Sequence, residues 1–210
     1  MVQTVIATQN DIDNILRCTN DAFMADAFFK KPEYHHRFTR ENVISKMSHK
    51  DSVFILARDG MASENSNNEV IGSIYLNWIT KTEWVVVDNS SIPKVTLIGT
   101  FSAVSVPSKY GKRGIGKTLV ASAENYLLEN VFKVIQHQMS SSVNIINNNN
   151  PQFDVVMEIE VVNLRVDLFP WYEKQGYQIV DKIKPNDVEF TVKILDGMDV
   201  FFILMRKKLL

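Results

Sequence analysis

Apolar residues recur at two spacings along the chain, and the spacing predicts most of its secondary structure. Alternating or continuous apolar runs predict strands over residues 2–6, 53–57, 70–79, 96–106, 155–162, 177–183 and 198–207. Helical spacing predicts helices over residues 12–23, 39–47, 115–127 and 168–175, the last ended by Gly176. Strands and helices are therefore interspersed along one chain, which is typical of a mixed α/β protein.

Two segments do not fit this pattern, and both are interpreted as inserts. Residues 81–94 contain a run of valines after Trp84 and predict either an extra strand or an excursion from the sheet. Residues 139–152 contain three consecutive serines and four consecutive asparagines. Such a low-complexity segment has little apolar surface to bury, so we expect it to form a loop.

Composition limits the class of protein. The 210 residues are 45% hydrophobic and 22% charged, with a net charge of −1, which predicts one globular domain over residues 1–210 and no general affinity for nucleic acid. Cys18 is the single cysteine, which excludes an internal disulfide. No apolar run has the roughly 18 residues of a membrane span, and the N-terminus does not resemble a secretory signal. We therefore expect a cytoplasmic protein without a membrane partner.

The octapeptide Gly111-Lys112-Arg113-Gly114-Ile115-Gly116-Lys117-Thr118 lies between a predicted strand and a predicted helix. Glycines let the backbone approach a ligand closely, and a helix N-terminus adds partial positive charge. The segment therefore predicts a site for a phosphate or pyrophosphate. It fits two fingerprints, which are the nucleotide-binding P-loop G-x-x-x-x-G-K-[ST] and the coenzyme A pyrophosphate loop of acetyltransferases.

The residues around this octapeptide disfavour its interpretation as a P-loop. A P-loop directly follows a core strand, whereas residues 107–110 intervene here. The chain after the loop contains too few alternating strands and helices for a nucleotide-hydrolase sheet. The apolar run that ends at Asp88 would suit magnesium binding, but it precedes the loop. A P-loop nucleotide-binding protein remains an alternative prediction.

Two motifs together resemble the GCN5-related N-acetyltransferase (GNAT) superfamily. Residues 104–116, Val-Ser-Val-Pro-Ser-Lys-Tyr-Gly-Lys-Arg-Gly-Ile-Gly, resemble its central strand, turn and pyrophosphate loop. Residues 168–177, Leu-Phe-Pro-Trp-Tyr-Glu-Lys-Gln-Gly-Tyr, resemble its second signature. The order of predicted elements also agrees over nearly the whole chain. The resemblance implies an α+β acyl-CoA N-acyltransferase fold, with a mostly antiparallel central sheet and helices on both faces.

The resemblance also implies acetyl-CoA as co-substrate, no metal, and direct transfer to a primary amine of a small molecule or protein, by a monomer or homodimer. The coenzyme would bind along Val104, Ser105, Val106, Gly111, Lys112, Arg113, Gly114, Ile115, Gly116, Lys117 and Thr118. A bulge at residues 104–106 would free a backbone N–H for the thioester oxyanion. Gly111 replaces the usual Arg or Gln, and Arg165 replaces a usual Asn, for which Asn163 is the nearest substitute. These departures leave open a non-catalytic acyl-CoA-binding protein.

Three side chains are candidates for proton transfer. Tyr172 matches the family's general acid, which would protonate the departing thiolate. Glu158 and Glu160 lie two apart on one predicted strand, so they share a face and are candidates for the general base. A water molecule relayed by backbone carbonyls could replace that base. The resemblance places the acceptor pocket between the first two helices, near Phe28, Phe29 and Tyr34.

Overall fold

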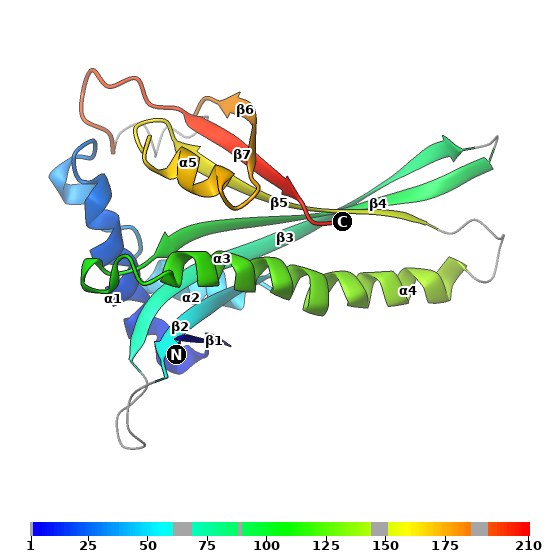
Figure 1. The fold of residues 1–210 in the computed structure, drawn as a ribbon, viewed down its shortest axis with the longest axis horizontal. Helices are drawn as coiled ribbons and strands as arrows, with labels where there is room; N and C mark the ends of the chain where they lie inside the picture. Colours follow the sequence, from blue (N-terminus) through cyan, green and yellow to red (C-terminus); the bar gives the residue numbers. More distant parts are fainter. Residues whose placement is uncertain (1, 61–68, 88–89, 144–150, 186–192) are drawn as a thin grey trace.

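The computed structural model describes residues 2–60, 69–87, 90–143, 151–185 and 193–210. The strands are β1 (Val2–Ile6), β2 (Ser52–Asp59), β3 (Val70–Val87), β4 (Ser90–Ser105), β5 (Gln152–Val162), β6 (Gln178–Ile183) and β7 (Phe202–Lys208). Among the described residues they form one sheet in the order β1-β2-β3-β4-β5-β7-β6. The β4–β5 pair is parallel, and every other pair is antiparallel. The expected mixed fold with a mostly antiparallel sheet is confirmed (Figure 1).

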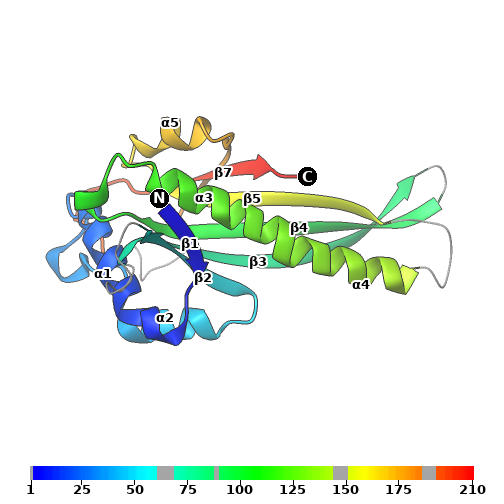
Figure 2. The same ribbon diagram turned by 60° about the horizontal axis from the view of Figure 1, so that its bottom comes forward.

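Helices cover both faces of the sheet, as expected. They are α1 (Ile12–Phe23), α2 (Arg40–Ser48), α3 (Ile115–Tyr126), a π-helical turn over Leu127–Phe132, α4 (Lys133–Val143) and α5 (Leu168–Glu173). Helices α1 and α2 pack on one face, whereas α3 and α5 pack on the other (Figure 2). Strand β2 shows why, since Ile55 and Ala57 face α3 while Phe54 and Leu56 face α1. This alternation gives the sheet two apolar cores.

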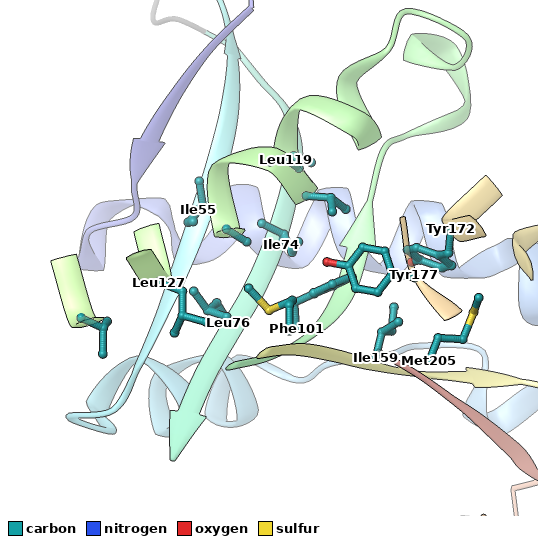
Figure 3. Packing of buried hydrophobic residues seen from close by; sticks show 14 of the residues in the cluster. Ile55, Ile74, Leu76, Phe101, Leu119, Leu127, Ile159, Tyr172, Tyr177 and Met205 are labelled. Atoms are coloured by element: carbon teal, nitrogen blue, oxygen red, sulfur yellow. The ribbon is translucent and has the colours of Figure 1, made fainter. Parts of the chain in front are cut away.

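The larger core, on the α3 face, connects the two halves of the sheet. Phe101 of β4 lies at its centre, with ring centroids 6.0 Å from Tyr172 and 5.6 Å from Tyr177 (Figure 3). The Tyr177 hydroxyl donates to Glu124 of α3 at 2.8 Å, and Lys207 of β7 donates to the same carboxylate at 2.7 Å. The central helix is therefore tied to the C-terminal strands through one buried carboxylate.

The structure resolves part of what the sequence left open. Residues 81–94 are the distal part of a long hairpin, because β3 extends to Val87 and β4 begins at Ser90. Residues 139–143 were predicted to be a loop but continue α4 as helix, and Gln152 already belongs to β5. The rest of that predicted loop, residues 144–150, lies outside the described residues. None of the described helices is long and apolar enough to cross a membrane.

Candidate active site

The candidate site lies where two neighbouring parallel strands separate. Strands β4 and β5 pair only from Lys94–Gln152 to Thr100–Glu158, after which β5 pairs with β7 alone. A cavity of about 710 Å³ lies between the separated ends. It is lined by residues 102–104 of β4, residues 159–162 of β5, parts of α1 and α5, and the start of α3. Separation of the strands thus creates a cavity in the middle of the sheet.

A β-bulge in β4 faces this cavity. Ser102 lies opposite Tyr75 of β3, and Ser105 lies opposite Ser73, so three steps along β4 match two along β3. Ala103 adopts φ 51°, a left-handed conformation that an L-residue adopts at some cost. Because β5 has already separated, Ala103 and Val104 have no partner residue on either neighbouring strand. The bulge lies at 103–104, overlapping the predicted segment 104–106 at Val104.

The glycine loop leads from this bulge into α3. Gly114 is the N-cap residue of α3 and has φ 77°, which favours glycine. A Cβ at Gly114 would meet nothing within 4 Å, so its face is open. A Cβ at Gly116 would lie 3.2 Å from the Trp171 ring of α5. Gly116 therefore lets α5 approach the start of α3, and Gly116 and Trp171 both line the cavity.

The basic side chains around the glycine loop differ in whether they already form an ion pair. Arg113 donates to Asp59 at 3.0 Å, and Lys109 contacts Glu69 at 3.1 Å. Lys112 and Lys117 form no ion pair with any residue that the structure describes. The two lysines therefore remain available to an anion at the N-terminus of α3, together with its backbone N–H groups.

The P-loop prediction fails on the fold. Strand β4 has one parallel neighbour, whereas a nucleotide-hydrolase sheet is built from alternating parallel strands and helices. The structure therefore leaves the glycine loop without the sheet that a P-loop requires. The Thr118 hydroxyl donates to the Gly114 carbonyl at 3.3 Å.

Tyr172 lines the cavity from α5 and is 3% exposed. Its ring packs against Trp171, with centroids 4.7 Å apart. Its hydroxyl forms no hydrogen bond with another residue in the described part of the chain, in contrast to Tyr177. Burial raises the pKa of Tyr172, and the nearby Arg165 guanidinium opposes part of that rise. The hydroxyl is therefore protonated at neutral pH.

The two candidate bases differ in their surroundings. Glu158 lies opposite Arg206 of β7 and accepts from its Nε at 2.7 Å. Glu160 lines the cavity, is exposed, and forms no ion pair with a described residue. The structure therefore makes Glu160 the better-placed base of the two.

Asn163 does not face the cavity. Its amide accepts from the Phe201 backbone at 3.0 Å and donates to the Asp199 carbonyl at 3.1 Å, so it holds the chain that leads into β7. Among the three aromatic residues expected at the acceptor pocket, Phe29 lines the cavity, whereas Phe28 and Tyr34 do not.

Sequence reasoning missed a charged cluster at the α1 end of the cavity. Asp26, which is 7% exposed, accepts from Arg165 at 2.8 Å and from Lys30 at 3.4 Å. Arg165 also donates to Asp167 at 3.0 and 2.9 Å, and Arg37 lines the same end of the cavity. Asp26 and Arg165 are 139 positions apart, so no local pattern could indicate their contact.

Solved structures of acetyltransferases share this architecture. NAA60 from Arabidopsis thaliana in complex with a bisubstrate analogue matches with a TM-score of 0.58 at 14% identity, over 100% of both chains. The ribosomal-protein-S18-alanine N-acetyltransferase from Escherichia coli matches with a TM-score of 0.56 at 11% identity, over 99% of this chain and 94% of that one. The PaiA N-acetyltransferase from Thermoplasma acidophilum, in complex with coenzyme A, matches with a TM-score of 0.55 at 16% identity, over 99% of both chains.

Comparison of the sequence with protein-family models and with curated proteins gives no match. At these identities the structural likeness defines the fold: the chain has the GNAT acyltransferase fold.

Proposed function

We propose that this protein transfers the acetyl group of acetyl-CoA directly to a primary amine. The observation that carries the proposal is the cavity between β4 and β5, which joins a bulged strand, a glycine loop at a helix N-terminus and a buried tyrosine. The fold supports it, because the neighbours above include N-acetyltransferases crystallised with coenzyme A or a bisubstrate analogue.

Each part of the cavity suits one part of the coenzyme. The N–H groups at the start of α3, with Lys112 and Lys117, would bind the pyrophosphate. A backbone N–H of Ala103 or Val104, which have no partner residue on a neighbouring strand, would donate to the thioester oxygen as negative charge develops on it. Positioning the amine beside the thioester supplies much of the rate acceleration in such a transfer.

Proton transfers complete the proposed mechanism. The amine nitrogen bonds to the acetyl carbon and loses one proton, for which Glu160 or a water molecule is the acceptor. The carbon–sulfur bond breaks, and the sulfur takes one proton, for which the Tyr172 hydroxyl is the donor. Acetylated amine and free coenzyme A are the products.

Calorimetric titration with acetyl-CoA and with Mg-ATP tests the coenzyme assignment. We expect saturable binding of acetyl-CoA and none of Mg-ATP. Gly114→Asp should weaken acetyl-CoA binding, because its carboxylate would repel the pyrophosphate. Gly114→Asn is the matched control, since Asn has a similar shape and adopts positive φ comparably well. One added charge near a dianion should make the Asp variant bind at least about tenfold more weakly than the Asn variant.

Equal affinities for these two variants, or binding of Mg-ATP in place of acetyl-CoA, would contradict the proposed coenzyme site. Acetyl-CoA binding without thiol release against any amine would instead favour a non-catalytic acyl-CoA-binding protein. That alternative is kept because Gly111 and Arg165 depart from the residues usual in the family.

A further inference from the structure

Cationic side chains gather at the α1 end of the cavity around a single buried carboxylate. Lys30, Arg37 and Arg165 all line the cavity there. Asp26 is the buried carboxylate among the described lining residues, and Arg165 and Lys30 share it at 2.8 and 3.4 Å. Lys30 therefore shares its one carboxylate with Arg165, which has Asp167 as a second partner, and Arg37 lies beside them.

Lys30 is buried with few partners. Its side chain is 9% exposed, and the Asp26 carboxylate is the one acceptor for its three N–H donors among the described residues. The rings of Phe23 and Phe29 surround the ammonium, with centroids 5.4 and 5.6 Å away. The ammonium thus has two cation–π contacts and one long contact with a carboxylate, which leaves N–H donors available to a second anion.

Arg37 lies at the same end of the cavity and is exposed. Its guanidinium lies 5.2 Å from the centroid of the Phe23 ring and forms no ion pair with a carboxylate in the described part of the chain. Burial lowers the pKa of Lys30, and repulsion from Arg37 and Lys193 adds to that effect while Asp26 opposes it. Lys30 and Arg37 thus both lie against the Phe23 ring, with its centroid 5.4 Å from the ammonium and 5.2 Å from the guanidinium.

The other carboxylates on the lining form no ion pair with Lys30 or Arg37 in the described part of the chain. Asp21 and Glu160 are exposed, and neither forms an ion pair with a described residue. Asp167 is exposed and already pairs with Arg165. An anion bound between Lys30 and Arg37 would relieve their repulsion and complete the hydrogen bonding of Lys30.

We propose that the acceptor carries a carboxylate beside its reacting amine, and that Lys30 and Arg37 bind this carboxylate. The inference rests on the proposed acetyl transfer and names its substrate class. The bonds formed and broken are those of the acetyl transfer above.

Thiol-release kinetics with matched acceptors test the proposal. The panel pairs each free amino acid with its amide and its decarboxylated amine, and it pairs a peptide that begins with Glu with one that begins with Gln. The first set tests free amino acids and the second tests acidic peptide N-termini. We expect kcat/KM to be at least about tenfold higher for the carboxylate member in one set.

Variants of Lys30 and Arg37 test whether these two cations cause the preference for an acceptor with a carboxylate. Arg37→Gln should lower kcat/KM for the carboxylate acceptor about tenfold and leave its neutral partner nearly unchanged. Lys30→Gln should do the same, provided that its melting curve shows a folded protein. Arg40→Gln is the matched control, since Arg40 pairs with Asp13 and does not line the cavity. Equal rates for both members of every pair, or equal losses for both in Arg37→Gln, would overturn the proposal.

Product binding distinguishes failure of this inference from failure of the acetyl transfer. With coenzyme A bound, an N-acetyl amino acid should bind at least about tenfold more tightly than its N-acetyl amide, whether or not turnover is seen. Binding of acetyl-CoA without turnover of any amine would count against the acetyl transfer alone. Equal affinities for the two products would count against the carboxylate site, even in an active enzyme.

Discussion

Replacing Tyr172 by phenylalanine should lower kcat with little change in stability or in affinity for acetyl-CoA. The tyrosine ring is 3% exposed and packs against Phe101, Trp171 and Tyr177, with centroids 6.0, 4.7 and 5.9 Å away. Phenylalanine keeps all three contacts. The hydroxyl that is lost has no hydrogen-bond partner among the described residues. The variant therefore removes a candidate proton donor and little else.

The size of the effect follows from the proposed role. General-acid assistance is typically worth about 10²- to 10⁴-fold. We expect about 10²-fold, equivalent to about 2.7 kcal/mol, because a coenzyme A thiolate is already a tolerable leaving group and water can enter the cavity. Stability should change by less than about 1 kcal/mol, since no hydrogen bond between protein groups is lost.

Tyr177→Phe is the matched control. Tyr177 is equally buried, but its hydroxyl donates to Glu124 at 2.8 Å, and it does not line the cavity. Its loss should cost roughly 1.5–3 kcal/mol of stability and leave kcat unchanged. Single-turnover thiol release would measure chemistry apart from product release, and thermal unfolding would measure stability. An unchanged single-turnover rate in Tyr172→Phe would refute the acid role and reduce Tyr172 to a packing residue.

Three further predictions follow from the same contacts. Gly99→Ala should lower the melting temperature by several degrees, because its Cβ would lie 2.6 Å from a buried leucine side chain and overpacking costs about 1–3 kcal/mol; an unchanged melting curve would mean that the core has room to spare. Glu160→Gln should lower kcat about 10²-fold near neutral pH, whereas Glu158→Gln should mainly weaken the sheet by loss of its Arg206 ion pair; unchanged turnover in the first would leave a water molecule as base. Burial raises the pKa of Tyr172 and Tyr177, so above about pH 10 the unfolded chain binds fewer protons than the native one, and stability should fall as pH rises. Denaturant titrations of the Tyr177→Phe variant should show a shallower fall, and a fall equal to that of the parent would exclude Tyr177 as a cause.

Local signals in the sequence were sufficient for the main elements of the fold and for the glycine loop. Alternating apolar residues predicted the strands, and Gly176, which has a positive φ, lies just after α5, where it was predicted to end that helix. Gly114 was predicted at the boundary between loop and helix, where the structure has it with positive φ. Such features depend on neighbours within a few residues, which a sequence displays directly.

Features that depend on long-range contacts were missed or misplaced. The valines and Trp84 in residues 81–94 resemble a core strand, yet Trp84 is 71% exposed on an extended hairpin. The ion pair of the candidate base Glu158 with Arg206 was not predicted, because it depends on the register of β5 with β7. Asp26 and Arg165 meet because β5 separates from β4. The segment between β5 and α5, which contains Arg165, then lies beside the end of α1. Sequence periodicity contains no information about contacts between residues that are far apart in the chain.

Mass spectrometry of an amine acceptor, incubated with the purified protein and acetyl-CoA, is the most direct test of the proposed acetyl transfer. We predict that the acceptor gains one acetyl group for each coenzyme A thiol released, at a rate proportional to protein concentration. Below saturating acetyl-CoA, Gly114→Asp should lower both signals more than Gly114→Asn does. Acetyl-CoA that binds the protein but transfers its acetyl group to no amine, including amino acids, acidic peptides and polyamines, would contradict the proposal.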